Sequence, residues 1–200
     1  MGFGDSGSDS GCNAGLTGVL GAAAGAVIGS GNRAAGAAVG GAVGALACIA
    51  YNYSTRQKRS AKQVEKEYEN KNGALPPKTQ VLRYSAALQP NNMVSSGSSA
   101  TLVSNIELVK GRDAAEPKVE EALEMRSPDG KVVNTARKSA QGIKGSGEFE
   151  NQFTFTLPKG VDEGIYPIDL TLYVDGERKD TRAVRMQVAS NGALRWLAAR

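Results

Sequence analysis

Glu120, Glu121 and Glu124 form a dense group of carboxylates in the middle of the chain. Paired carboxylates perform acid–base chemistry on glycosides, and clustered carboxylates bind calcium. The surrounding residues alternate between apolar and polar types, which predicts a strand over residues 118–126, and basic residues nearby offer counter-charges. We therefore interpret the group as a solvated strand face, not as a catalytic or metal site.

Other routes to catalysis are also missing from the sequence. The chain has no histidine and two cysteines, which excludes a Ser-His or Cys-His catalytic pair and zinc sites built from these residues. The glycine-rich loop at residues 139–147 lacks the strand–loop–helix context of a phosphate-binding loop. We expect no cofactor and no metal, and we predict that the protein is not an enzyme.

Glycine recurs at every fourth position in two blocks near the amino terminus. On a helix, residues four apart share one face, so each block would form a groove of small residues that lets helices pack closely in lipid. A turn-forming sequence, Ser-Gly-Asn-Arg at residues 30–33, separates the blocks. The pattern predicts a two-helix membrane hairpin over residues 14–53, after a flexible start at 1–13. The helix-packing glycines are Gly21, Gly25, Gly29, Gly36, Gly40 and Gly44.

The length of this segment leaves an alternative open. Each arm has about 17 or 18 residues, whereas a membrane span needs about 20. A Gly/Ala-rich tail in water is the competing interpretation. Such a tail would not require glycine at every fourth position, with Val, Leu and Ile at the positions between, so we favour the hairpin.

Residues 12–60 resemble the glycine-zipper two-transmembrane family, which includes the rickettsial surface-antigen group of outer-membrane lipoproteins. The resemblance rests on Cys12, GVLGAAAGAVIG, SGNR and AAGAAVGGAVGALA. It implies a bacterial cell-envelope protein, in the outer membrane in preference to the inner membrane. It also makes Cys12 a candidate lipidation site. Residues 1–11 lack the apolar core of a signal peptide, so either the start lies upstream or Cys12 is not lipidated.

The positive charge of the chain gathers directly after the hairpin. Residues 54–78 carry seven basic and three acidic side chains, a balance of +4 that equals the net charge of the whole chain. Good helix formers predict a basic helical linker that ends before Pro76-Pro77. Its role is either to bind anionic headgroups or to act as a solvated spacer. The expected headgroup-binding residues are Arg56, Lys58, Arg59 and Lys62.

Seven alternating segments follow and predict an immunoglobulin-like β-sandwich over residues 79–190, with a tail at 191–200. The Gly-Ile-Tyr sequence at 164–166 and the turn at Asp175-Gly176 are similar to late strands of immunoglobulin-like and fibronectin-like domains, in which Tyr166 would be the corner tyrosine. The expected strands are residues 80–88, 99–110, 118–126, 131–140, 148–157, 165–174 and 178–189.

Together these features predict a non-enzymatic envelope protein in which a glycine-zipper hairpin anchors, and oligomerises, a β-sandwich interaction domain. The expected partners are the lipid bilayer, other copies of the chain and an envelope protein. No nucleic-acid-binding signature accompanies the basic stretch. The alternative is a membrane-active oligomer or pore formed by the zipper helices.

Overall fold

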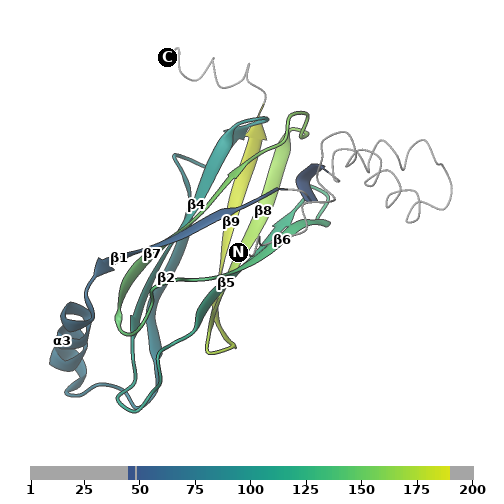
Figure 1. The fold of residues 1–200 in the computed structure, drawn as a ribbon. Coiled ribbons are helices and arrows are strands. Elements are labelled where there is room, and N and C mark those ends of the chain that lie inside the picture. Colours follow the sequence, from purple (N-terminus) through teal and green to yellow (C-terminus); the bar gives the residue numbers. More distant parts are fainter. Residues whose placement is uncertain (1–44, 48, 190–200) are drawn as a thin grey trace, which may run out of the picture.

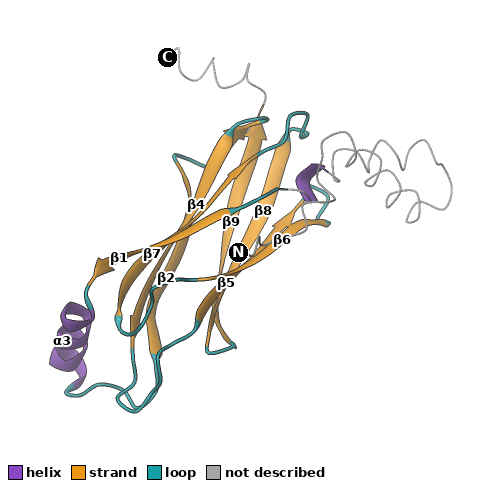
Figure 2. Cartoon of the chain, viewed as in Figure 1, coloured by secondary structure: helices purple, strands orange, loops and turns teal. Residues whose placement is uncertain are grey.

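The computed structural model describes residues 45–47 and 49–189, which form a β-sandwich with a helix at one end and a short helical turn at residues 45–47 (Figures 1 and 2). One sheet has the strand order β1-β7-β4-β2, and the other has the order β3-β9-β8-β5-β6. The strands are β1 (Asn52–Arg59), β2 (Gln80–Gln89), β3 (Met93–Ser95), β4 (Ser99–Val109), β5 (Val119–Arg126), β6 (Val132–Ser139), β7 (Gly147–Thr156), β8 (Gly164–Val174) and β9 (Glu177–Ala189), and the helix is α3 (Ala61–Asn72).

The prediction of an all-β sandwich is confirmed, and its seven expected segments correspond to β2 and β4 to β9. Alternation works because successive side chains of a strand point to opposite faces. In β5, every second residue is buried from Val119 onward. The Tyr166 hydroxyl donates to the Asp162 carbonyl oxygen at 3.0 Å, which forms the tyrosine corner typical of immunoglobulin-like sandwiches.

The helix predicted within the linker of residues 54–78 is confirmed where α3 lies and is wrong for the residues of β1. Residues 52–59 instead form an edge strand that pairs antiparallel with β7 from Asn52↔Thr154 onward. Sequence reasoning missed this strand because its side chains are almost all polar. An edge strand is covered on one side only, so its hydrogen bonds to β7 can hold it without an apolar stripe.

The carboxyl end of the predicted hairpin belongs to the sandwich. Leu46, Ile49 and Tyr51 are buried in the core between the two sheets. The Tyr51 ring meets Phe153 edge-on at 6.0 Å between centroids, and the Asn134 side-chain amide donates to the Leu46 carbonyl at 2.8 Å. Apolar side chains that pack here are withdrawn from a bilayer. The expected boundaries at 53 and 79 are therefore wrong, and the sandwich includes residues from 45 onward.

The rest of the predicted hairpin, with Cys12 and all six zipper glycines, lies outside the described residues. Across residues 45–47 and 49–189, no helix is both long enough and apolar enough to span a bilayer.

The chain enters and leaves the sandwich at one end. Asn52 at the start of β1 lies opposite Thr154, which pairs in turn with Thr101 near the start of β4. Ala189 at the end of β9 pairs with Ser95, just before the turn into β4. β1 then carries the chain across the molecule to α3 at the opposite end (Figure 1). An eight-residue strand spans about 26 Å at roughly 3.3 Å per residue.

Candidate functional site

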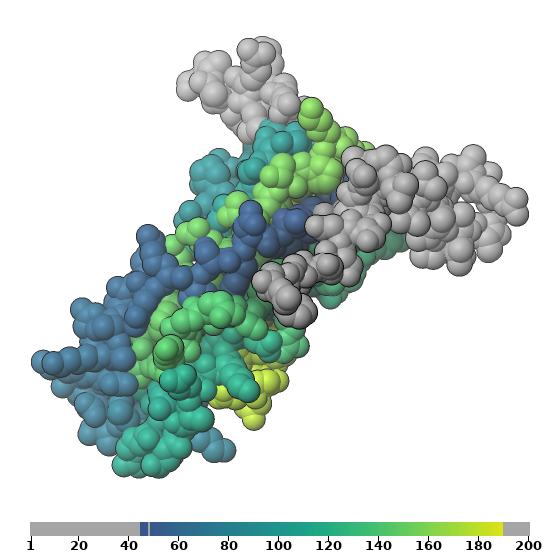
Figure 3. Space-filling model, viewed as in Figure 1, coloured from purple at the N-terminus to yellow at the C-terminus, as the bar shows by residue number. Residues whose placement is uncertain are grey.

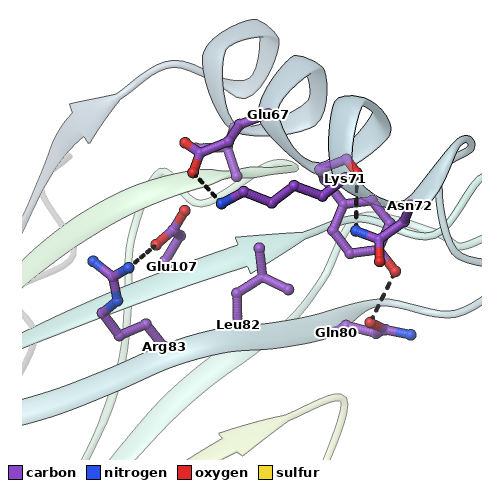
Figure 4. A pocket seen from close by; sticks show the side chains of 9 residues that line it. Glu67, Lys71, Asn72, Gln80, Leu82, Arg83 and Glu107 are labelled. Atoms are coloured by element: carbon purple, nitrogen blue, oxygen red, sulfur yellow. Dashed lines mark hydrogen bonds and ion pairs between the residues drawn. The ribbon is translucent and has the colours of Figure 1, made fainter.

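A groove of about 390 Å³ lies between α3 and the outer face of the four-stranded sheet, at the end away from the chain entry (Figure 4). We call it the α3 groove. It is lined by Val64, Glu67, Tyr68, Lys71, Asn72, Gln80, Leu82, Arg83 and Glu107.

Local sequence signals set the position of α3 above the sheet. Ser60 precedes the helix in an extended conformation, and its backbone N–H donates to Oε1 of Gln63 at 2.9 Å. Gly73 ends the helix with a positive φ of 83°, which glycine adopts without strain. Val64 is the fully buried residue of the helix, and the Tyr68 hydroxyl donates to Oε1 of Gln80 at 3.2 Å. These contacts attach the helix to the sheet and leave the groove open beside them.

A β-bulge supplies the apolar floor of the α3 groove. Val81 pairs with Leu108 and Arg83 pairs with Glu107, so Leu82 is an extra residue between the two pairs. Regular alternation over the expected strand at residues 80–88 would place Leu82 on the core face with Tyr84, and the structure departs from that alternation. Because the bulge shifts the alternation by one residue, Val81 packs against the core and Leu82 points into the groove, with 42% of its surface exposed (Figure 4).

The carboxylates of the groove are neutralised by arginine and lysine. Glu107 is nearly buried and lies 3.3 Å from Nη1 of Arg59 and 3.8 Å from Nη2 of Arg83. Glu67 accepts hydrogen bonds from Lys71 at 2.7 Å and Arg59 at 2.5 Å, and these two partners lower its pKa to about 2. The Lys71 and Arg83 side chains are 69% and 73% exposed. The most exposed charged side chains of the lining are therefore two cations, while Glu67, which is 43% exposed, is paired with Lys71 and Arg59.

Three of the four predicted headgroup-binding residues lie on β1, and the fourth lies at the start of α3. Arg56 and Lys58 both contact Glu150, at 2.8 and 3.1 Å, and Arg59 lies at the α3 groove. Lys62 is exposed on the first turn of α3. In the space-filling view, β1 runs along the surface from the entry end toward α3 (Figure 3). Headgroup binding stays a prediction, but β1 carries Arg59 and Lys62 away from the residues that precede it.

The solvated strand face predicted for the glutamates is wrong for Glu121. Its carboxylate is fully buried between the sheets. It accepts hydrogen bonds from the hydroxyls of Tyr53 and Tyr84, at 3.0 and 2.8 Å, and from the Asn151 amide at 2.9 Å. Glu120 and Glu124 do lie on the outer side, where they pair with Arg137 and Arg126.

A row of polar side chains crosses the sheet opposite Glu121. Thr55 pairs with Asn151, and Asn151 pairs with Ser104, so the three lie side by side on β1, β7 and β4. Thr55 Oγ1, Asn151 Oδ1 and Ser104 Oγ are buried without a hydrogen-bond partner among the described residues. Asn151 and Ser104 each interrupt a row of apolar residues on the core-facing side of their strands. Two polar interruptions in adjacent strands were the sequence signal for this cluster, and sequence reasoning missed it.

Burial governs the ionisation of this cluster. Desolvation raises the pKa of Glu121, against the opposing effect of its hydrogen-bond donors. Burial, together with the negative charge that Glu121 carries when ionised, also raises the pKa values of Tyr53 and Tyr84. Burial thus shifts Glu121 toward its protonated form, whereas the hydroxyl and amide donors around it oppose that shift of its pKa.

Comparison with known proteins finds no matching family model and no matching curated protein. Solved structures to which this chain is similar include the CARDB domain of a Pyrococcus furiosus protein in complex with di-metal ions, at 14% identity and TM-score 0.37 over 55% of this chain and 94% of that one. An immunoglobulin-like protein from Pseudomonas aeruginosa matches at 13% identity and TM-score 0.37, over 56% and 97%. The sporulation control protein of Bacillus subtilis matches at 15% and 0.38, over 60% and 56%. Similarity at this level assigns no ligand or activity.

Proposed function

We propose that this chain is a non-enzymatic, membrane-attached binding protein of the bacterial cell envelope. Residues 14–44 attach it to the bilayer, and the β-sandwich is its interaction module. The observation that carries the proposal is that the two ends of the sandwich differ. Both chain connections leave from one end, and the helix with its groove occupies the other end. Attachment at the first end presents the second to a partner.

The attachment we propose is shallower than a full transmembrane hairpin. Residues from 45 onward belong to the sandwich, which leaves residues 34–44 for the second arm. A helix of that length would be about 16 Å long at roughly 1.5 Å per residue, against a hydrocarbon core of about 30 Å. We therefore propose a hairpin that enters the bilayer without crossing it, with its glycine grooves packed against each other and against neighbouring copies.

The cellular location follows from the resemblance of residues 12–60 to outer-membrane lipoproteins. On that basis we propose the outer membrane in preference to the inner membrane, with an envelope protein as the partner of the sandwich. The absence of histidine and of clustered Cys and His ligands in the sequence supports a binding role rather than catalysis.

Membrane extraction of the full chain tests the proposal, with a deletion of residues 14–44 as the comparison. This deletion keeps Leu46, Ile49 and Tyr51, which a longer one would remove from the sandwich core. We expect the full chain to stay with membranes in high salt and to be released by detergent, because salt screens charge attraction but not apolar insertion. The deletion variant should be released without detergent. Release of the full chain by salt alone would contradict insertion.

A further inference from the structure

We infer that the α3 groove binds an extended, acidic peptide segment of a partner protein. The inference rests on the proposed function in one respect, that the sandwich is an interaction module, and it names the chemistry of the partner. Three features of the groove carry it: an apolar floor, a neighbouring sheet edge and a positively charged rim.

The apolar floor is built by residues from two elements. Leu82 faces the groove because of the bulge in β2, and α3 contributes Val64 and the ring of Tyr68. Bulges at sheet edges commonly redirect a side chain, and here the bulge turns a leucine out of the core and into an open groove. The volume of about 390 Å³ lies within the range of ligand pockets and accommodates a few side chains, not a whole folded surface.

The sheet edge beside this floor favours an extended ligand. β2 is the last strand of its sheet, and within residues 45–47 and 49–189 its only strand partner is β4. An edge strand presents unpaired backbone N–H and C=O groups, to which an extended peptide can add as a further strand. Alternate side chains of that peptide would reach over Gln80, Leu82 and the groove.

The rim determines the charge of the ligand. Lys71 and Arg83 are the strongly exposed charged residues of the lining, whereas Glu107 is nearly buried and Glu67 is bound by Lys71 and Arg59. Arg59 pairs with both Glu67 and Glu107, so Lys71 and Arg83 are not the sole partners of these carboxylates and can also meet a carboxylate arriving at the rim. A lysine-rich peptide would meet the same two cations and be repelled.

Peptide binding to the full chain in detergent solution tests the inference. The probe is a fluorescein-labelled short peptide in which glutamate alternates with valine, and its matched counterpart carries lysine in place of glutamate. Leu82→Ser removes the contribution of β2 to the apolar floor, and Arg83→Glu reverses the charge of one of the two exposed cations at the rim. Ile165→Ser and Arg185→Glu make the same changes at exposed positions of the other sheet and serve as controls.

Fluorescence anisotropy should show binding of the acidic peptide that weakens as salt increases. We expect each groove variant to weaken it by about tenfold or more, and each control to leave it within about twofold. Circular dichroism should show that all four variants are folded, since the substituted side chains are exposed. Absence of binding, equal binding of the basic peptide, or unchanged binding by the groove variants would overturn the inference.

Two further measurements separate this inference from its alternatives. Light scattering tests whether a second copy of the chain occupies the groove: a self-association lost in Leu82→Ser would overturn the peptide proposal. Membrane extraction of the same variants should match the parent chain. If peptide binding fails while membrane attachment persists, the inference fails and the attachment stands; if attachment fails while peptide binding persists, the reverse holds.

Discussion

Replacing Glu121 with glutamine removes an ionisable group from the sandwich core and keeps the shape of its side chain. Tyr53 and Tyr84 donate to different oxygens of Glu121, so one hydroxyl can still donate to the new amide oxygen and the other can accept from the new amide nitrogen. The amide of Asn151 can turn so that its unpartnered Oδ1 accepts from the new amide nitrogen. We therefore expect Glu121→Gln to fold with a loss of about 1 kcal/mol or less. Glu121→Ala would leave three buried donors unpaired, at about 1–3 kcal/mol each, and should unfold the domain or nearly so.

The diagnostic effect of Glu121→Gln is on the pH dependence of stability. Folding raises the pKa of Glu121, so the unfolded chain loses this proton first as pH rises. The stabilisation is fully present below the unfolded pKa of about 4.3 and is lost as pH rises through the folded value. Between these two values the free energy of unfolding should fall by about 1.4 kcal/mol per pH unit.

Few other side chains obscure this pH window. The chain has no histidine. Glu67 and Asp129 have pKa values lowered to about 2 by their hydrogen-bond partners, so the stability that they contribute is lost only as pH falls into the acidic range. No basic side chain forms an ion pair with Glu121 in the part of the chain that the structure describes. The raised pKa of Tyr53 moves its titration still further above neutral pH.

Urea unfolding of the full chain, followed by circular dichroism from pH 5 to pH 8, measures the effect. Wild type should lose stability as pH rises, whereas Glu121→Gln should lack this loss and give a nearly flat profile. Glu120→Gln is the matched control, because Glu120 lies on the outer face beside Arg137, and it should keep the wild-type slope. A flat wild-type profile, or the same slope in Glu121→Gln, would refute the argument that burial controls this carboxyl group.

Three further predictions concern boundaries and glycines. A fragment of residues 45–190 should fold alone. A fragment of residues 79–190 lacks β1 and three buried apolar residues worth about 1.5–3 kcal/mol each, so circular dichroism should show that this shorter fragment is largely unfolded. Equal stability of the two fragments would refute a sandwich that begins at residue 45. Gly111→Ala should cost about 1–3 kcal/mol in urea unfolding, because its Cβ would lie 2.5 Å from the Pro77 carbonyl oxygen, and Gly145→Ala, which meets no atom within 4 Å, should be near neutral. Gly40→Leu should reduce crosslinking between copies in detergent by filling the small-residue groove, and unchanged crosslinking would argue against zipper packing.

Strand prediction succeeded where one face of a strand meets the core and the other meets solvent. β8 and β9 carry alternating apolar residues, and their pattern alone locates them. It failed for β1, whose sequence NYSTRQKR has the composition of a solvated helix. That strand is determined by its hydrogen bonds to β7 and by the pairing of Arg56 and Lys58 with Glu150, which are distant in sequence.

The candidate groove was beyond the reach of sequence reasoning for a related reason. Regular alternation places Leu82 in the core, and only the unequal pairing of β2 with β4 creates the bulge that turns it outward. The helix beside Leu82 connects β1 to β2 in the chain, and these are the two edge strands of the sheet. No local pattern records that α3 crosses β7 and β4 on the way.

The sequence by itself determined the class of the fold, the position of seven strands, the corner tyrosine and the lack of histidine chemistry, because these depend on composition and on local periodicity. Tertiary structure decided which polar residues are buried and which apolar residues are not. Glu121 became an interior acid because Tyr53, Tyr84 and Asn151 arrive from three other strands. Burial and partnership are properties of contacts between distant segments, so the sequence around a single residue does not contain them.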